Sequence, residues 1–261
     1  MNHKYTLKQR QNLILQKLHE ENIVFIKNLM AQFGISEVSV RKDLAALEEK
    51  GLLTRVRGGA VNLQQNSEAG FISTATKATL NAPQKQAIAR FAAGLVEDGE
   101  TILLDSGTTC LELAKNLGEK EGLTVVTNSI SAAQVIMRME KSSVILLGGM
   151  VYPASESTVG QDAAEMLRNY WCDKLFVGVD SCNMNGISTP YIVEAGLNQA
   201  MIESAGEIIA VFDSSKFGQR RLAHICDLDK LDAVVTDSGI PDEYREYLIK
   251  LGKRLYIVDD F

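Results

Sequence analysis

The chain of 261 residues carries a formal net charge of −6, is 46% hydrophobic and contains four cysteines and three histidines. Its length suits one small domain and one larger domain with a full hydrophobic core. No apolar run approaches the roughly 20 residues needed to span a bilayer, and the polar N-terminus does not fit a signal peptide, so we expect a cytoplasmic protein without a membrane partner. The cysteines and histidines are too widely spaced for a zinc site or a disulfide framework, which predicts buried or inert thiols, no metal and no cofactor.

The first 61 residues begin with the pattern of a helix-turn-helix. Thr6 and Gln9 have the spacing of a capping box, and the apolar residues that follow predict a helix to about residue 20. The apolar spacing of Ile26–Phe33 predicts a second, short helix that ends in a tight turn at Gly34.

The third predicted helix has a small, basic outer face. Ser36 is placed to cap this helix by accepting a hydrogen bond from the amide of Ser39. On a helical wheel Val40, Leu44 and Leu47 share one apolar face, and the residues opposite are small or basic, as a helix in the DNA major groove requires. The predicted DNA-binding residues on this helix are Ser36, Val38, Ser39, Arg41 and Lys42.

A basic wing is predicted after this helix. Residues 53–57 and 60–63 flank Gly58-Gly59, which predicts a β-hairpin with its turn at the two glycines. Arg55 and Arg57 would lie on the hairpin and reach the DNA backbone or minor groove, so both are predicted DNA-binding residues. A module that contacts proteins, or a core of three small helices, is the alternative; the order of the elements and the basic face favour DNA.

Positive charge is concentrated in this part of the chain. Residues 1–61 hold ten Lys and Arg and six Asp and Glu, a net charge of +4 that leaves −10 for the remainder. An acidic total does not exclude DNA binding, because counterion release depends on the face that meets the phosphates.

The larger domain is predicted to be an α/β fold. Residues 62–83 are rich in Gln, Asn, Ser, Thr and Ala without periodicity, which predicts a linker between domains at 1–61 and 84–261. Beyond the linker, short Val/Ile/Leu runs alternate with helical segments, which indicates a Rossmann-like, mainly parallel sheet covered on both faces. The predicted strands are 101–104, 123–126, 144–147, 175–179, 208–212, 233–235 and 255–258.

Polar residues follow these strands, at the sheet edge where parallel sheets bind ligands. Residues 105–109 (Asp-Ser-Gly-Thr-Thr) lie between a strand and a helix, so they present amides, hydroxyls and a helix N-terminus to an anion such as phosphate. Lys216 can add a positive charge, whereas the side chains of Asp105, Asn128 and Asp180 can hold sugar hydroxyls. The predicted effector-binding residues are Asp105, Ser106, Gly107, Thr108, Thr109, Thr127, Asn128, Ser129, Gly148, Gly149, Asp180 and Lys216.

Other interpretations of these residues are weaker. The loop lacks the Gly-Lys-Ser/Thr ending of a nucleoside triphosphate loop and the three-glycine dinucleotide fingerprint, so ATP and NAD are not favoured. Ser, Thr, Gly and Asp are also ordinary turn and cap residues, but their presence at five strand ends favours a binding site. Tyr170 and Trp171 are predicted to be core residues.

The whole chain resembles the DeoR family of bacterial transcription regulators. The resemblance rests on residues 36–44 (Ser-Glu-Val-Ser-Val-Arg-Lys-Asp-Leu), 57–60 (Arg-Gly-Gly-Ala), 105–109, 127–129 (Thr-Asn-Ser) and 213–218 (Asp-Ser-Ser-Lys-Phe-Gly). It implies a winged helix that binds double-stranded operator DNA and a sensor domain related in fold to ribose-5-phosphate isomerases. It further implies repression of a sugar, sugar-alcohol or nucleoside catabolic operon that is relieved by a phosphorylated sugar. Residues 105–109 and Lys216 match the family's phosphate-binding positions.

Two positions depart from the family pattern. The helix after Glu194 often carries a Lys-Arg pair in the family, whereas here it reads Leu197-Asn198-Gln199. The wing often has His or Tyr where this chain has Arg57. These changes concern which ligand or operator is recognised.

The competing hypotheses are a sugar-phosphate isomerase fused to a DNA-binding module, and a DNA-binding protein without a ligand. Asp105, Asp180 and Lys216 offer acid–base groups, but residues 197–202 contain no Asp or Glu, so we expect no enzymatic activity. A ligand-free protein does not explain the polar strand ends. Because one recognition helix contacts few base pairs, we expect a homodimer or homotetramer assembled through the larger domain.

Overall fold

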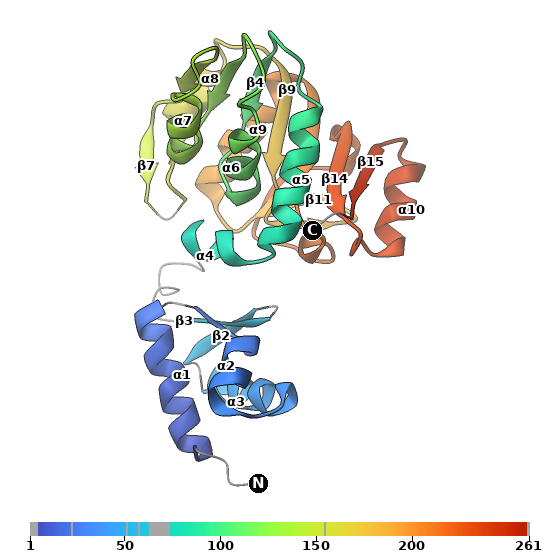
Figure 1. Ribbon diagram of the computed structural model, residues 1–261. Helices are drawn as coiled ribbons and strands as arrows, with labels where there is room; N and C mark the ends of the chain where they lie inside the picture. Colours follow the sequence, from blue (N-terminus) through green and yellow to red (C-terminus); the bar gives the residue numbers. More distant parts are fainter. Residues whose placement is uncertain are drawn as a thin grey trace. The chain divides into compact units, whose positions relative to one another are not determined.

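The computed structural model describes residues 5–21, 23–50, 52–56, 58–62, 74–153 and 155–259. The chain forms two compact units, Met1–Thr76 and Lys77–Phe261 (Figure 1). The division falls inside the predicted linker, whose last part is helical: α4 covers Thr74–Thr79 and α5 begins at Ala82. The sequence of α4 lacks an apolar period, so its helical structure could not be read from the pattern.

The first unit contains the predicted three helices, α1 (Leu7–Glu21), α2 (Ile26–Phe33) and α3 (Glu37–Glu49). Thr6 and Gln9 form the capping box: the Thr6 amide donates to Gln9 Oε1 at 2.8 Å, and the Gln9 amide donates to Thr6 Oγ1 at 3.4 Å. Gly34 ends α2 in the left-handed conformation. The Ser36 hydroxyl caps α3 by accepting from the Ser39 amide at 3.3 Å. The buried residues of one core join all three helices to the wing: Ile14, Leu18, Val24, Ile26, Leu29, Phe33, Val40, Leu44, Leu47, Leu53 and Ala60.

The wing is a three-stranded sheet in the order β1 (Ile23–Phe25), β3 (Gly59–Asn62), β2 (Leu53–Val56). Strand β1 was not predicted. The predicted turn at Gly58-Gly59 was one residue too late: Val56 pairs with Gly59, so Gly59 is a strand residue. Gly59 also pairs with Phe25, and a Cβ at Gly59 would lie 2.0 Å from the Val24 carbonyl oxygen. Close contact with β1 explains this glycine, and a positive φ of 88° explains Gly58.

The second unit is built on a parallel sheet of seven strands in the order β15-β14-β12-β9-β4-β5-β6. All seven predicted strands are present, with ends that shift by up to three residues. Their bounds are β4 Thr101–Leu104, β5 Thr124–Thr127, β6 Ser143–Leu146, β9 Cys172–Gly178, β12 Ala205–Val211, β14 Ala233–Asp237 and β15 Arg254–Val258.

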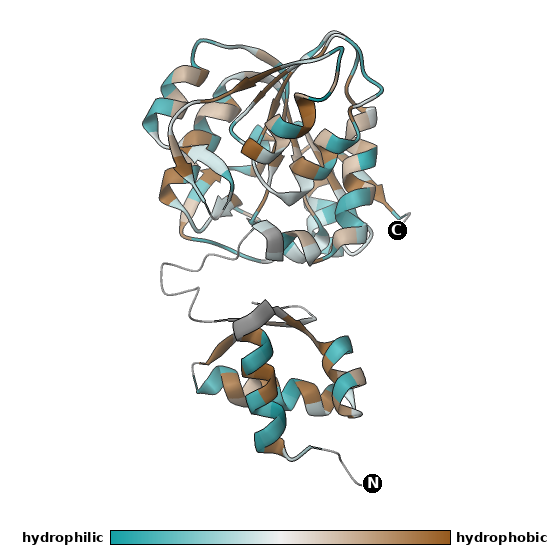
Figure 2. Cartoon of the chain, turned by 60° about the vertical axis from the view of Figure 1, so that its left-hand side comes forward, coloured by the Kyte–Doolittle hydropathy of each residue, from teal (hydrophilic) through white to brown (hydrophobic). Residues whose placement is uncertain are grey.

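Helices cover both faces of this sheet, as predicted, and Figure 2 shows the hydrophobic strands inside the domain. Alternate strand residues point to opposite faces: Ile102 and Leu104 belong to the core under α5 (Ala82–Gly94), α6 (Thr108–Lys115) and α7 (Ile130–Ile136). Leu103 belongs to the core under α8 (Gln161–Leu167), α9 (Ile192–Glu203) and α10 (Asp242–Lys250). None of the described helices combines the length and hydropathy of a membrane-spanning segment.

Short antiparallel strands complete the domain and were not predicted, because three or four residues give no readable alternation. They form the pair β7 (Met150–Tyr152) and β8 (Ser157–Val159), and the sheet β10 (Ser181–Asn183), β11 (Gly186–Thr189), β13 (Ala223–Cys226). Two 3₁₀ turns, η1 (Ser214–Lys216) and η2 (Leu228–Lys230), flank β13 in the chain.

The cysteines follow the prediction, whereas one aromatic residue does not. All four cysteines are buried, and burial raises the thiol pKa of each, to about 12 for Cys182 and Cys226. Tyr170 packs against the core as a partly buried residue. Trp171 was predicted in the core but is 67% exposed, because it lies in the turn between α8 and β9.

Candidate functional site

The outer face of α3 is arranged as the sequence predicted. Val38 is 63% exposed and Lys42 is exposed, while Val40 on the opposite face is fully buried. Arg41 is exposed and donates from Nε and Nη2 to Glu37 Oε1 at 2.8 and 2.6 Å. This pair holds the guanidinium along the helix, and a DNA phosphate would compete with Glu37 for it.

The hydroxyls at the start of α3 are partly used by the helix itself. Ser36 Oγ caps the helix, and it also lies 3.1 Å from Ser39 Oγ. A hydroxyl both donates and accepts, so each group retains capacity for a further hydrogen bond.

Of the two wing arginines, the structure describes Arg55. Arg55 donates from its amide and from Nε to Glu48, at 2.8 and 2.6 Å. The hydrogen bonds from the Arg55 backbone and then from its side chain lower the pKa of Glu48. Glu48 therefore stays charged and ties the hairpin to the end of α3. Arg57 lies outside the described residues and stays a prediction.

In the larger domain, the chain reverses direction across the sheet between β4 and β9. From β4 the strands proceed to β5 and β6 on one side, and then from β9 to β12, β14 and β15 on the other. The carboxyl ends of β4 and β9 therefore flank the switch point at which open α/β sheets bind ligands. Asp105 and Asp180 follow these two strands.

Asp105 is fixed at the switch point by backbone amides from both strands. Its Oδ1 accepts from the Ser106 amide at 2.7 Å, and its Oδ2 accepts from the Gly178 amide at 3.1 Å. A Cβ at Gly178 would lie 3.2 Å from the Ser106 carbonyl oxygen, so the glycine permits this close approach. Asp105 is only 5% exposed.

The N-terminus of α6 follows directly. Gly107 is its N-cap, with a φ of 123°, and no side chain caps the first amides. Thr108 and Thr109 are buried, and their hydroxyls make no hydrogen bond among the described residues. Uncapped amides and free hydroxyls at a helix N-terminus suit an anion.

The predicted residues after β5 divide into two groups. Thr127 Oγ1 donates to the Leu104 carbonyl at 2.6 Å, and Ser129 caps α7 by accepting from the Ala132 amide at 3.1 Å. These two hydroxyls therefore hold local structure. Asn128 differs, because its Oδ1 is buried without a donor among the described residues, while its Nδ2 donates to the Thr158 carbonyl at 3.2 Å.

The glycines after β6 are placed by a steric requirement. Gly149 has a φ of 136°, and a Cβ there would lie 2.9 Å from the Val159 carbonyl oxygen. The Gly148 amide lies 3.2 Å from Met166 Sδ. Both glycines are exposed at the far side of β5 from Asp105.

Asp180 is held by residues that the sequence did not identify. Its Oδ1 forms an ion pair with Lys77 Nζ at 2.7 Å, and its Oδ2 accepts from Thr189 Oγ1 at 3.2 Å. Burial works against the charge of Asp180, but the Lys77 ammonium holds the pKa of this carboxyl below its usual value. Thr189 Oγ1 also lies 3.4 Å from Glu194 Oε2, in the first turn of α9.

Three carboxylates crowd this edge of the sheet. Burial, and then the neighbouring charge of Asp180, raises the pKa of Glu194 to about 7. Burial, and then Glu194, likewise raises the pKa of Asp105 to about 7. The neighbouring Asn198 side chain acts in the opposite direction and lowers the pKa of Asp105. A neutral residue of α9 therefore lies beside Asp105, in the part of the helix where the family often has a Lys-Arg pair.

The loop after β12 places Lys216 at the same edge. Asp213 caps η1, and the Ser214 amide and hydroxyl bind Asp237 at 2.6 and 2.7 Å. Lys216 is half-buried, and its ammonium has no hydrogen bond or ion pair among the described residues. Its charge acts on both Asp180 and Lys85, so it lies in the same electrostatic field as the strand-end residues.

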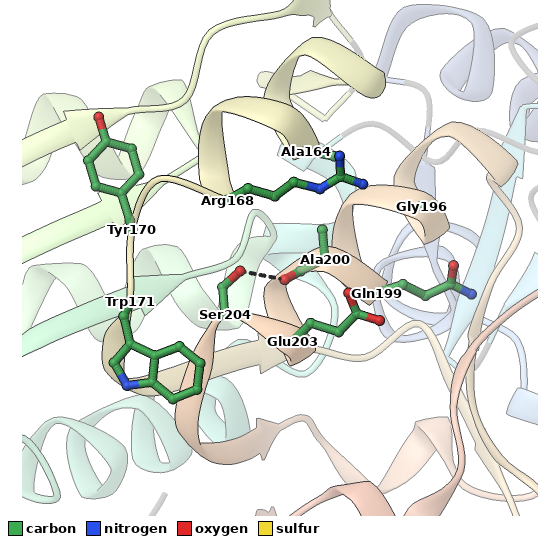
Figure 3. Close-up of a pocket in the computed structure, with 9 residues that line it drawn as sticks. All are labelled: Ala164, Arg168, Tyr170, Trp171, Gly196, Gln199, Ala200, Glu203 and Ser204. Carbon is green, nitrogen blue, oxygen red and sulfur yellow. Dashed lines mark hydrogen bonds between the residues drawn. The ribbon is translucent and has the colours of Figure 1, made fainter.

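A separate surface hollow of about 380 Å³ lies between α8 and α9 (Figure 3). None of the predicted effector residues lines it. Trp171 projects at one end, and the single hydrogen bond drawn joins Ser204 Oγ to the Ala200 carbonyl at 2.8 Å. Within the described part of the chain, no group of His, Cys, Asp or Glu residues is arranged to hold a metal ion.

Comparisons with known proteins agree with this architecture. The DeoR-like helix-turn-helix domain matches residues 10–66, and the DeoR C-terminal sensor domain matches residues 80–238. The "Putative aga operon transcriptional repressor" of Escherichia coli O157:H7 is 35% identical over 97% of this chain and 94% of that protein. The transcriptional repressor AccR of Agrobacterium fabrum is 34% identical over 92% and 96%, and the repressor GlcR of Bacillus subtilis is 29% identical over 96% of each.

Among solved structures, ribose 5-phosphate isomerase A of Methanocaldococcus jannaschii aligns with 52% of this chain and 55% of that protein, with 20% identity and a TM-score of 0.39. Similarity at this level has no implication for activity. The full-length relatives are transcriptional regulators, so the fused-isomerase hypothesis is not supported. The chain belongs to the DeoR family of helix-turn-helix transcriptional regulators with a DeoR C-terminal sensor domain.

Proposed function

We propose that this regulator represses a carbohydrate catabolic operon and leaves its operator when a phosphorylated sugar binds at the strand ends of the sensor domain. The observation that carries the proposal is the combination of two kinds of group at one sheet edge. The uncapped N-terminus of α6 and the ammonium of Lys216, which has no partner among the described residues, suit a phosphate. The buried groups of Asp105 and Asn128 and the partly exposed carboxylate of Asp180 suit hydroxyls.

Each group has a role in this proposal. The amides of Thr108 and Thr109, with their hydroxyls, bind phosphate oxygens, and Lys216 supplies a charge. Asn128 Oδ1 accepts a hydrogen bond from a sugar hydroxyl, which satisfies a buried acceptor that otherwise costs about 1–3 kcal/mol. The remaining predicted residues shape the edge of the site: Ser106, Gly107, Thr127, Ser129, Gly148 and Gly149.

Operator binding is assigned to α3 and the wing. Val38, Arg41 and Lys42 present a small, basic face, and Ser36 and Ser39 lie at its N-terminal end. Arg55 and Arg57 would reach the backbone or minor groove beside it. Repression, as opposed to activation, is supported by the three relatives that are named repressors.

We further propose a cytoplasmic homodimer or homotetramer, because paired recognition helices bind half-sites spaced by whole turns of about 34–36 Å. Light scattering on the full chain should give a mass of two or four subunits. A monomer that binds its operator at nanomolar concentration would contradict this assembly.

A thermal-shift screen with sugar phosphates tests the effector class. A ligand that binds only the native state stabilises it by about 2.7 kcal/mol at a hundred times its dissociation constant. Each sugar phosphate should be paired with its unphosphorylated sugar, which we expect to give no shift. Equal shifts for both members of every pair would place phosphate recognition in doubt, and a hit that fails to release DNA would contradict its role as inducer.

A further inference from the structure

The last part of the linker, from α4 to the start of α5, is bonded to the proposed effector-site residues. Lys77, in α4, forms the ion pair with Asp180 after β9. Asn81, between α4 and α5, donates from Nδ2 to Asp213 Oδ1 at 2.7 Å and to Ser215 Oγ at 3.2 Å. The first stretch of the sensor domain is therefore held by side chains from two strand ends, both more than a hundred residues later in the chain.

A buried lysine in α5 also holds the end of α4. Lys85 in α5 is 4% exposed, and its ammonium donates to the backbone carbonyl of Lys77. Burial lowers the pKa of Lys85 to about 8, while the charge of Asp213 acts in the opposite direction. A buried ammonium needs a hydrogen-bond acceptor, and the Lys77 carbonyl provides one. This bond therefore fixes the position of the end of α4.

Lys77 is the cation that balances the crowded carboxylates. Burial disfavours its charge, but Asp180 and, more weakly, Glu194 and Asp105 raise the pKa of Lys77 above its usual value. Its ammonium also lies 5.9 Å from the centre of the Tyr191 ring. Lys77 is therefore a cation that faces all three carboxylates of this edge.

We propose that the ion pair between Lys77 and Asp180 is the connection through which effector binding controls the DNA-binding domain. The proposal rests on the proposed effector site. A phosphate competes for the Lys77 ammonium, and a sugar hydroxyl competes for the Asp180 carboxylate, so a bound sugar phosphate separates the pair. Separation releases α4, which the rest of the linker joins to the DNA-binding domain in the chain.

This mechanism meets the requirement for allosteric coupling. A ligand shifts an equilibrium between two states only by making different interactions in each. The two states here are α4 bonded through Lys77 to Asp180, and α4 released with both charged groups engaged by the ligand. Coupling of this kind typically changes affinity by about 5- to 150-fold.

The test replaces Lys77 by methionine in the full chain and measures affinity for an operator selected from random DNA. We expect K77M to bind about tenfold or more weakly than the parent without any sugar phosphate, and to show little further release when one is added. The matched control is Lys174→Met, which removes the ion pair with Glu100 at the opposite ends of β9 and β4. That pair is also partly buried, so K174M reports the effect of losing such a pair away from the site.

A charge exchange separates the pair from either residue alone. Lys77→Asp and Asp180→Lys should each weaken operator binding, and the double variant should recover most of it, because the pair is restored in reverse. Hydrogen exchange of residues 74–85 in the parent should increase when a sugar phosphate that gives a thermal shift is added. The parent segment should be unaffected by the matching free sugar.

Other outcomes overturn the proposal. Parental affinity in K77M, or a loss no larger than that of K174M, would show that the ion pair does not control the DNA-binding domain. Tighter binding by K77M would show that the intact pair opposes DNA binding, which contradicts the proposed direction of control. If no sugar phosphate shifts the parent, the proposed effector is wrong. The comparison of K77M with K174M on DNA alone still decides the role of the pair, so the two failures are distinguishable.

Discussion

Arg10 and Asp43 form a buried, two-point ion pair that joins α1 to the recognition helix α3. Arg10 Nε lies 2.7 Å from Asp43 Oδ2, and Arg10 Nη2 lies 3.2 Å from Oδ1. The side chains are 12% and 3% exposed. The hydrogen bond to Asp43 raises the pKa of Arg10. This pair fixes the rotation of α3 about its own axis, and with it the face of α3 that we propose contacts DNA.

Removing one partner should therefore be costly. Arg10→Met leaves the Asp43 carboxylate buried and unpaired, and we expect it to destabilise the DNA-binding domain by about 3–5 kcal/mol. The double variant Arg10→Met/Asp43→Leu should recover much of this loss, because no buried charge remains. Calorimetric unfolding of the full chain measures both. Equal unfolding temperatures for the parent and Arg10→Met would mean that the pair is not formed in solution.

The two wing glycines should respond differently to alanine. A Cβ at Gly59 would meet the Val24 carbonyl oxygen at 2.0 Å, so Gly59→Ala must displace β1 from the wing. At Gly58 the space is open, and only the positive φ opposes a side chain, at about 1 kcal/mol. We expect Gly59→Ala to lower stability and operator affinity clearly more than Gly58→Ala. The reverse order would contradict the pairing of β3 with β1.

The exposed basic residues of α3 should affect DNA binding without affecting stability. Arg41→Ala and Lys42→Ala should both weaken operator binding, and loss of a phosphate contact should reduce the slope of log affinity against log salt by about one. Unfolding temperatures should stay at the parental value, because both side chains are exposed. If both variants bound the operator as tightly as the parent at physiological salt, α3 would not be the helix that lies in the major groove.

The features predicted best from the sequence are those that depend on residues three or four positions apart. The capping box of Thr6 and Gln9 and the Ser36 cap are short-range bonds, so the residue types alone indicated them. The hairpin turn was misplaced by one residue because the requirement for Gly59 comes from β1, more than thirty residues earlier in the chain. Local patterns contain no information about that contact.

The candidate site shows the same division. Asp105, Asn128 and Asp180 were identified because each directly follows a strand with a clear apolar run. Lys77, Lys85 and Glu194 were missed, since they lie on helices and reach the site only through the fold.

The crowded carboxylates make stability depend on pH. Folding raises the pKa values of Asp105 and Glu194 from 3.8 and 4.5 to about 7. Between those values the folded protein retains protons that the unfolded chain has released, so stability falls as the pH rises toward 7 and the penalty is complete above it. Glu194→Gln removes one of these charges. We expect it to raise the unfolding temperature at pH 8 and to change it little at pH 4.

The control for that experiment is Glu165→Gln, which removes an exposed carboxylate of α8. If Glu194→Gln gave the same shift at both pH values, the carboxyl of Glu194 would not titrate in this range. Its interaction with Asp105 would then be too weak to matter.

The proposed phosphate contacts should affect induction and not operator binding. Lys216→Ala and Thr108→Ala each remove one group from the strand ends while leaving α3 and the wing unchanged. Charge-assisted hydrogen bonds contribute roughly 1.5–3 kcal/mol, so effector affinity should fall about ten- to a hundredfold with Lys216→Ala and less with Thr108→Ala. Lys250→Ala, on the exposed end of α10, is the matched control. Titrating the thermal-shift ligand against each variant, with and without operator DNA, measures both effector affinity and operator binding. If both variants released DNA at the parental ligand concentration, the phosphate site would not lie at this sheet edge.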